Sequence, residues 1–139
     1  MSDLLWQLGA METAELISKK DVSTREVIKN HLERLTEVNP KINAITRSLN
    51  DEAMEMAILA DEKISRNEQI GPLHGVPVTI KDNVDITGQT SPNGVSKLED
   101  NLAPANSPVV DNLLKAGAIP IGRTNTPEFS LRWHTGNPV

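Results

Sequence analysis

The stretch between residues 76 and 122 constrains the fold most, because it alternates strand and helix patterns in a fixed order. An apolar, β-branched run at Val76–Ile80 predicts a strand, and a long loop over 82–106 follows it. Residues 107–117 then predict a helix with a serine–proline start and a glycine stop, and residues 118–122 predict a second strand. Because a crossover through a helix joins parallel strands, this order predicts part of a parallel sheet.

Residues 3–66 carry a helical pattern instead, with apolar side chains mostly at spacings of three and four. The clearest start signal is the capping box Ser23–Glu26, in which each side chain can bond the other residue's backbone amide. We expect that helix to end at Asn39–Pro40, because a proline disfavours helix in the residue before it. Helices are therefore predicted up to about residue 9 and at 11–19, 23–39 and 51–65.

Residues 41–46 alternate well enough to predict a short strand with Ile42 and Ile45 facing inward. Aromatic residues make up only 2% of the chain, so the core has to be built from aliphatic side chains and methionine. In the helix predicted after this strand, the core-facing positions are Met54, Ala57 and Ile58.

The local chemistry changes near Asn67, where glycine and proline become frequent and apolar runs shorten. The 139 residues have the length of one ordinary domain, so we interpret the change as a join between a mainly helical arm, 1–70, and the start of an α/β core, 71–139. Two strands and one helix cannot supply the doubly covered sheet that such units normally form. The predicted fold class is α/β, with a helical arm followed by the start of a mixed, mainly parallel sheet covered by helices, incomplete within this chain.

Charge and rare residue types exclude several function classes. The 14 Lys and Arg residues are scattered and the formal net charge is −5, so no nucleic-acid partner is predicted. The chain has no cysteine, and His31, His74 and His134 lie far apart, so we expect no metal and no cofactor. No segment approaches the ~20 apolar residues of a membrane span and no signal segment is recognisable, which predicts a cytoplasmic protein without a membrane partner.

Lys81 is the single charge at the end of the apolar run, and Asp82 and Asn83 follow it as turn residues that stop the strand. Three interpretations of this lysine are open. Its ammonium reaches solvent, or pairs with Asp82, Asp85 or another carboxylate, or is a desolvated base. Paired lysines are commoner than perturbed ones, so the residue pattern alone favours a structural role.

Two other catalytic patterns do not occur in the sequence. A phosphate-binding loop needs Gly-x-x-x-x-Gly-Lys followed by Ser or Thr, whereas Lys81 follows Val-Thr-Ile and precedes an aspartate. No Gly-x-Ser-x-Gly is present, so a hydrolase triad with a histidine base is unsupported, and we interpret His74 as a turn or packing residue.

Two motifs resemble those of the amidase-signature hydrolases. The first is Gly71–Asn83, which reads GPLHGVPVTIKDN, and the second is Ser107–Phe129, which reads SPVVDNLLKAGAIPIGRTNTPEF. They occur in the family's order and flank a loop of plausible length, and the helical lead-in, including Val38–Ala44, is also similar. The resemblance covers nearly the whole chain and implies the N-terminal portion of an amidase.

The resemblance implies a Ser, cis-Ser, Lys triad that hydrolyses small-molecule carboxylic amides through an acyl-enzyme. Lys81 matches the family's lysine, which as a neutral amine accepts a proton from the cis-serine. We expect Asp82 and Asn83 to support the site, and the loop after them to lie beside the substrate. The expected substrate-loop residues are Thr90, Ser91, Asn93 and Gly94.

By the same resemblance, both catalytic serines and the oxyanion donors belong to a segment that follows the Asn-Pro at residues 137–138. The sequence stops at Val139, so we expect this chain to be inactive alone. Its unfinished core could be covered by a partner or by a second copy. Two alternatives stay open, namely the A subunit of a glutamyl-tRNA amidotransferase and a non-enzymatic, truncated binding or interaction remnant.

Overall fold

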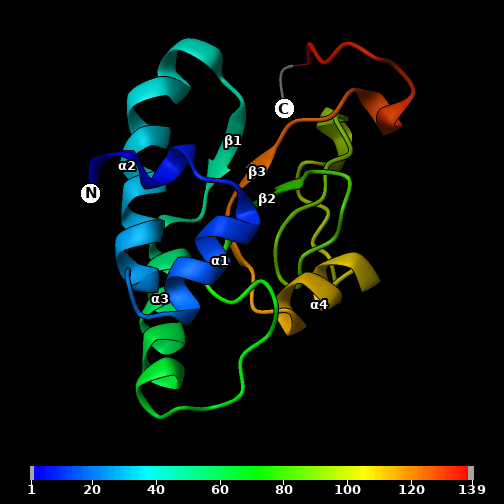
Figure 1. Cartoon of the computed structure of the whole chain (residues 1–139). Helices are drawn as coiled ribbons and strands as arrows, with labels where there is room; N and C mark the ends of the chain where they lie inside the picture. Colours follow the sequence, from blue (N-terminus) through cyan, green and yellow to red (C-terminus); the bar gives the residue numbers. More distant parts are fainter. Residues whose placement is uncertain (1, 138–139) are drawn as a thin grey trace.

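The computed structural model describes residues 2–137 and shows a mixed α/β fold (Figure 1). The α-helices are α1 (Ala10–Ser18), α2 (Thr24–Ile42), α3 (Asn50–Ser65) and α4 (Pro108–Lys115). The strands are β1 (Ile45–Ser48), β2 (Pro77–Lys81) and β3 (Ile119–Thr124), and three short 3₁₀ turns are η1 (Ser2–Gln7), η2 (Ser96–Leu98) and η3 (Glu128–Ser130).

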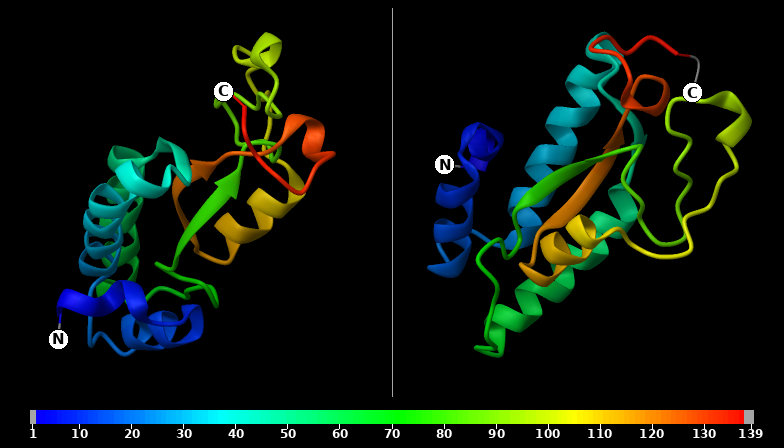
Figure 2. Two further views of the ribbon diagram at one scale, coloured as in Figure 1. Left: turned by 90° about the horizontal axis from the view of Figure 1, so that it is seen from above. Right: turned by 90° about the vertical axis from the view of Figure 1, so that its right-hand side faces the viewer.

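The sheet has the order β1-β3-β2, so β3 lies in the middle. Strands β2 and β3 run parallel, with Lys81 opposite Thr124 at their carboxyl ends, and β1 runs antiparallel to β3. The parallel pair predicted from residues 76–122 is therefore confirmed, and the first half of the chain adds the antiparallel strand. Figure 2 shows α2 and α3 on one side of this sheet and α4 on the other.

The main core lies where α2 and α3 meet the sheet. Its buried side chains are Ile28, Leu32, Ala53, Ala57, Ala60, Ile119 and Ile121. The core face of α3 consists of alanines, and such small side chains allow two helices to approach closely. The prediction for Ala57 is thus confirmed and Met54 is partly buried, but the prediction for Ile58 is wrong, because its side chain is 44% exposed.

Helix α2 runs two residues past Pro40, so the predicted stop at Asn39–Pro40 is wrong. A proline removes its own N–H and crowds the carbonyl four residues before it, and here both effects fall near the end of the helix. The helix ends instead at Asn43, which adopts the left-handed conformation with φ of 46°. The predicted strand therefore begins only at Ile45, and Ile42, expected to face inward, is 62% exposed on the helix.

The capping box at the start of α2 is confirmed. Ser23 Oγ accepts the Glu26 amide at 3.1 Å, and Glu26 Oε2 accepts the Ser23 amide at 2.8 Å. The Asp61 carboxylate on α3 also accepts the Thr24 amide at 2.6 Å and pairs with Arg25 at 2.9 Å. These bonds fix the first turn of α2 against α3.

The strand and helix patterns of the second half are also confirmed, with shifted ends. Strand β2 spans Pro77–Lys81, whereas the sequence predicts Val76–Ile80. Strand β3 continues to Thr124 instead of stopping at Gly122. Helix α4 stops before Gly117, whose φ of 90° is accessible to glycine at little cost. Across residues 2–137, no helix combines the length and the apolar character needed to cross a bilayer.

Candidate active site

The carboxyl ends of the two parallel strands define the candidate site. Lys81 ends β2 and Thr124 ends β3, and the Asp82 amide donates to the Thr124 carbonyl at 2.8 Å, which extends the pairing by one residue. In open α/β sheets, ligands bind outside the carboxyl ends of the strands. The side chains that follow β2 and β3 are therefore the ones to consider for chemistry.

Lys81 has an exposed side chain, whereas its neighbour Ile80 is buried, as the alternation along a strand requires. No hydrogen bond or ion pair joins Lys81 Nζ to any other residue within 2–137. Of the three interpretations open from the sequence, pairing with Asp82 or Asp85 is absent there. The Lys81 side chain is exposed at the edge of the site.

Asp82 is buried and pairs with Arg123 instead of Lys81. Asp82 Oδ1 lies 3.1 Å from Arg123 Nε, at ion-pair distance though without a well-aligned hydrogen bond between these two atoms. The other oxygen, Oδ2, accepts the Thr46 hydroxyl of β1 at 2.9 Å. Asp82 therefore connects β1, β3 and the turn after β2.

Arg123 is fully buried at the centre of this network, although it is not among the site residues predicted from the sequence. Its guanidinium donates to the carbonyls of Lys81 at 3.3 Å and Val84 at 2.9 Å, and to Gln89 Oε1 at 3.4 Å. Burial lowers the pKa of Arg123, and the negative charge of Asp82 opposes that shift. The signal available in the sequence was an arginine at the end of an apolar strand, with an aspartate just after the neighbouring strand.

The predicted substrate loop is anchored to β1 and to itself. Arg47 of β1 donates to Thr90 Oγ1, and Thr90 forms a bridge with Leu102 across the loop. Ser91 is fully buried, and its amide donates to the Asn101 carbonyl at 2.9 Å. The Ser91 hydroxyl has no hydrogen-bond partner among the described residues. Ser91 thus lies inside the loop and not on its surface.

Asn93 and Gly94 pack against the segment that follows β3. The Phe129 amide donates to the Asn93 carbonyl at 2.9 Å. Gly94 has φ of 70°, and a Cβ there would lie 2.4 Å from the Thr126 carbonyl oxygen, so only glycine fits. Asn137 Nδ2 donates to the same oxygen at 2.7 Å. The loop and the end of the described chain are joined at this point.

Asn83 connects the turn after Lys81 to that same segment. Its Nδ2 donates to Ser130 Oγ at 2.9 Å, and Ser130 Oγ shares a hydrogen bond with Thr126 Oγ1 at 2.8 Å. Of the residues expected from the sequence, the structure therefore brings Asn83, Asn93 and Gly94 to residues 126–130. Thr90 is held to β1 instead.

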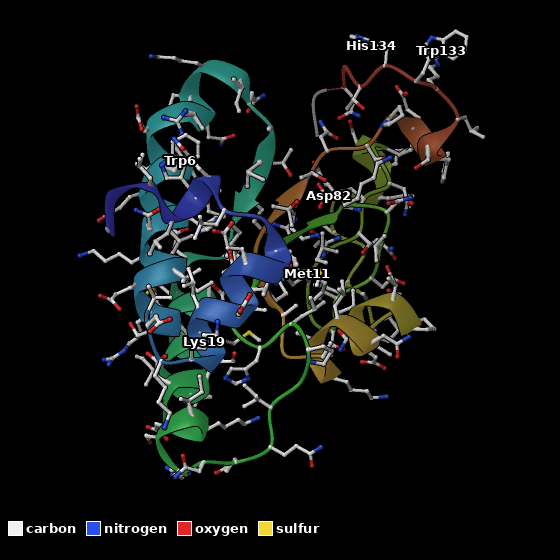
Figure 3. All side chains as sticks on the ribbon, viewed as in Figure 1. Trp6, Met11, Lys19, Asp82, Trp133 and His134 are labelled. Atoms are coloured by element: carbon white, nitrogen blue, oxygen red, sulfur yellow. The ribbon has the colours of Figure 1, made fainter. Side chains whose placement is uncertain are left out.

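The terminal segment carries exposed side chains of its own. Figure 3 shows Trp133 and His134 at the outer end of this segment, away from Asp82. A hollow of about 410 Å³ is lined there by Glu128, Leu131, Arg132, Trp133, His134 and Gly136. Because Lys81 is not among its lining residues, we do not assign this hollow to the candidate site.

The histidines have other partners. His74 is buried with Nε2 3.1 Å from the Ala60 carbonyl, and His31 Nδ1 lies 2.8 Å from the Val27 carbonyl. Among the described residues, no three His, Cys, Asp or Glu side chains gather closely enough to hold a metal ion. The contact of His74 with α3 gives it a packing role.

Comparison with known proteins adds sequence relatives to this geometry. The family model described as Amidase matches residues 26–139. The chain is 47% identical over 135 residues to the indoleacetamide hydrolase of Bradyrhizobium diazoefficiens, a match that covers 97% of this chain and 26% of that protein. It is 41% identical over 133 residues to the A subunit of the glutamyl-tRNA(Gln) amidotransferase of Thermoanaerobacter pseudethanolicus, covering 96% of this chain and 27% of that one.

Solved structures agree with these relatives. A bacterial aryl acylamidase of the amidase signature family superposes with a TM-score of 0.86 at 30% identity, over 92% of this chain and 27% of that one. A fatty acid amide hydrolase superposes with a TM-score of 0.92 at 24% identity, which shows a shared fold. The chain thus spans about a quarter of the length of the proteins it matches. It belongs to the amidase signature family.

Proposed function

We propose that this chain supplies the lysine base of an amide hydrolase with a Ser, cis-Ser, Lys triad. The observation that carries the proposal is the position of Lys81, an exposed lysine with no ion-pair partner within 2–137, at the carboxyl end of a parallel strand. It lies in the motif Gly71–Asn83 that resembles the family's lysine motif. An ion pair would hold the lysine in its charged form, and Lys81 makes none within 2–137.

The proposed reaction divides the work between Lys81 and two serines from the family's serine-rich segment. As a neutral amine, Lys81 takes a proton from the cis-serine, which takes one from the nucleophilic serine. That serine attacks the amide carbonyl, the amine leaves with a proton, and water then hydrolyses the acyl-enzyme. Because residues 1–139 contain neither of these serines by the resemblance, the chain alone is proposed to be inactive.

The supporting residues follow from their contacts. Asp82 and Asn83 hold the turn after Lys81, the first through Arg123 and the second through Ser130. Gly94 is proposed to shape one wall of the substrate site, because it joins the loop to the segment after β3. Asn93 is proposed to form the same wall, because its carbonyl accepts the Phe129 amide. Thr90 and Ser91 are proposed to hold the loop in place, the first through Arg47 of β1 and the second through Asn101. The substrate is proposed to be a small-molecule carboxylic amide.

A chimera tests the proposal. In it, this chain replaces the matching 26% of the Bradyrhizobium diazoefficiens indoleacetamide hydrolase, and ammonia release from indoleacetamide is measured. We expect turnover by the chimera and none by the isolated chain. In the chimera, Lys81→Ala should lower kcat/KM by a factor of about 100 to 10,000, the usual contribution of a general base. Lys97→Ala, an exposed lysine in the loop, is the matched control and should stay within about twofold of the unaltered chimera.

Two results would contradict the proposal. Turnover by the isolated chain that disappears in Lys81→Ala would disprove its inactivity, and an unchanged rate of the Lys81→Ala chimera would remove the lysine from the mechanism. A folded but inactive chimera would favour the non-enzymatic alternative.

A second candidate function is that of a glutamyl-tRNA amidotransferase A subunit, favoured by the 41% identity to such a protein. The two candidates share the lysine chemistry and differ in the amide that is cleaved. Glutamine as the preferred substrate of the native protein, or genes for partner subunits beside its own, would favour the amidotransferase. Preference for an aryl or alkyl amide would favour the free-standing hydrolase.

A further inference from the structure

One buried guanidinium bonds to consecutive points of the turn that follows Lys81. Arg123 contacts the carbonyl of Lys81 itself, the carboxylate of Asp82 and the carbonyl of Val84. It also reaches Gln89, further along the same loop. These partners of the side chain therefore all lie on the segment that leaves β2.

The acceptors of this guanidinium are concentrated on one segment. A buried arginine needs acceptors for its N–H groups in addition to a counter-charge, and these acceptors can lie on any element around it. Here two backbone carbonyls on either side of Asp82 also accept from the same Nη2 atom. The Lys81 carbonyl additionally accepts the Val84 amide at 2.9 Å, which closes the turn. The guanidinium thus bonds to both ends of a closed four-residue turn.

We propose that Arg123 is a positioning residue, whose guanidinium fixes the backbone of residues 81–84 and thereby the place from which the Lys81 side chain leaves the sheet. This inference rests on the proposed function, since the position of Lys81 matters to catalysis only if Lys81 is the base. Arg123 touches no substrate and acts through Lys81. A misplacement of about 1 Å at a reacting group can cost a factor of about 100 in rate.

Arginine suits this position for a geometric reason. Its planar fork presents several N–H groups in fixed directions, so one side chain can bind a carboxylate and carbonyls together. A lysine at 123 would keep the charge for Asp82, but its three N–H donors leave from one nitrogen and cannot serve Asp82, Gln89 and both carbonyls of the turn together, so at least one of these four acceptors loses its donor. Arg123→Lys therefore keeps the positive charge and loses the planar arrangement of donors, whereas Arg123→Met loses both.

The first arm of the test uses the 139-residue chain and residue-resolved hydrogen exchange. In Arg123→Met and Arg123→Lys, the Val84 amide should exchange at least about tenfold faster, because its acceptor, the Lys81 carbonyl, is no longer held. The Ile28 amide in the core of α2 should keep its rate, which shows that the chain stays folded. Arg66→Met, at an exposed arginine paired with Glu62, is the matched control and should change neither amide. Unchanged Val84 exchange in both Arg123 variants would overturn the inference.

If Arg123→Met unfolds the chain, Ile28 will exchange faster as well, and the double variant Asp82→Asn/Arg123→Met replaces it. This variant leaves no unpaired buried charge, so it should fold, and Val84 should still exchange faster than in the unaltered chain. A double variant with normal Val84 exchange would contradict the inference.

The second arm uses the chimera and separates kcat from KM. Arg123→Lys should lower kcat about 10-fold to 100-fold, with KM within about twofold, after correction for the folded fraction by circular dichroism. A merely structural role predicts a kcat equal to that of Arg66→Met once this correction is made, and that result would overturn the inference. If Lys81→Ala leaves the chimera's rate unchanged, the proposed function has failed. Val84 exchange in the isolated chain still decides whether Arg123 positions the turn.

Discussion

At the scale of single residues, the Asp82 carboxylate pairs with Arg123 and not with Lys81. Lys81 is next to Asp82 in the sequence, yet the carboxylate points to the buried Arg123 and leaves the lysine exposed. A pair between an exposed lysine and a carboxylate typically contributes less than about 1 kcal/mol, whereas a buried arginine without its counter-charge is costly. The buried arginine therefore takes the carboxylate, and Lys81 is left without a partner within the described residues.

This balance predicts how substitutions at the pair change stability. Arg123→Met should lower the free energy of unfolding by about 3 kcal/mol, because it leaves the Asp82 carboxylate buried and unpaired. Asp82→Asn/Arg123→Met should recover part of that loss, since no buried charge remains. Urea denaturation of the single and double variants measures both values. A double variant less stable than Arg123→Met alone would show that the carboxylate is not penalised by the loss of its partner.

Two glycines with the same backbone conformation allow a second test. Gly94 and Gly88 have φ of 70° and 74°, but a Cβ at Gly94 would meet the Thr126 carbonyl at 2.4 Å, while nothing lies within 4 Å of a Cβ at Gly88. Gly88→Ala should cost about 1 kcal/mol through conformation alone, and Gly94→Ala about 3 kcal/mol through conformation and contact together. Thermal or urea unfolding gives both values.

Hydrogen exchange locates the effect of the glycine substitutions. The Phe129 amide, which donates to Asn93, should exchange faster in Gly94→Ala and not in Gly88→Ala. Equal costs for the two substitutions would mean that the loop and the segment after β3 are not in contact in solution.

At the scale of secondary structure elements, the sequence predicts best where local chemistry decides the outcome. The capping box at Ser23 and the glycine stop of α4 are confirmed, because hydrogen bonds within a few residues determine them. The end of α2 was mispredicted because Pro40 lies in its last turn, where one lost bond is tolerated and Asn43 terminates the helix. A helix end that depends on one or two hydrogen bonds cannot be predicted from the position of a proline alone.

Pairing between distant segments was not predictable in the same way. Strand β1 lies beside β3 although 70 residues or more separate Ile45, Arg47 and Ser48 from their partners, and nothing in the sequence of β1 names that partner. The candidate site shows the same limit. Lys81, Asp82 and Asn83 are predicted from a contiguous motif, whereas Arg123 contacts Lys81 and Asp82 only after β2 and β3 have paired.

The stability of the chain is also predicted to depend on pH, through His31 of α2. Burial lowers the pKa of His31, and its contact with the Val27 carbonyl opposes this shift. A histidine with a lowered folded pKa binds its proton more weakly in the folded state than in the unfolded state, whose pKa is about 6.5. Its contribution to stability is therefore complete above about pH 6.5, and is lost as the pH falls through the folded pKa.

Urea denaturation between pH 7.5 and 5.5 measures this effect. The free energy of unfolding should fall toward pH 5.5, by less than about 1.4 kcal/mol per pH unit, which is the limit for one proton. His31→Gln should flatten this decline. An unchanged slope in His31→Gln would assign the pH dependence to other groups.

At the scale of the whole molecule, the chain has the mixed α/β fold of a member of the amidase signature family. Its described residues contain the pair of parallel strands whose carboxyl ends hold Lys81, and the helices α2 and α3 that cover the sheet (Figures 1 and 2). It matches its relatives over about a quarter of their length, and the proposed reaction takes its two serines from the serine-rich segment that the resemblance implies.

The role of Lys81 as a base is tested most directly by comparing Lys81→Arg with Lys81→Ala in the chimera. Arginine keeps the positive charge but does not deprotonate in proteins, so it cannot serve as a base. We predict that both variants lose a factor of about 100 to 10,000 in kcat/KM for indoleacetamide, and that Lys97→Arg and Lys97→Ala stay within about twofold of the unaltered chimera. A Lys81→Arg variant that retains most of the activity would show that Lys81 supplies only a positive charge, and would contradict the account.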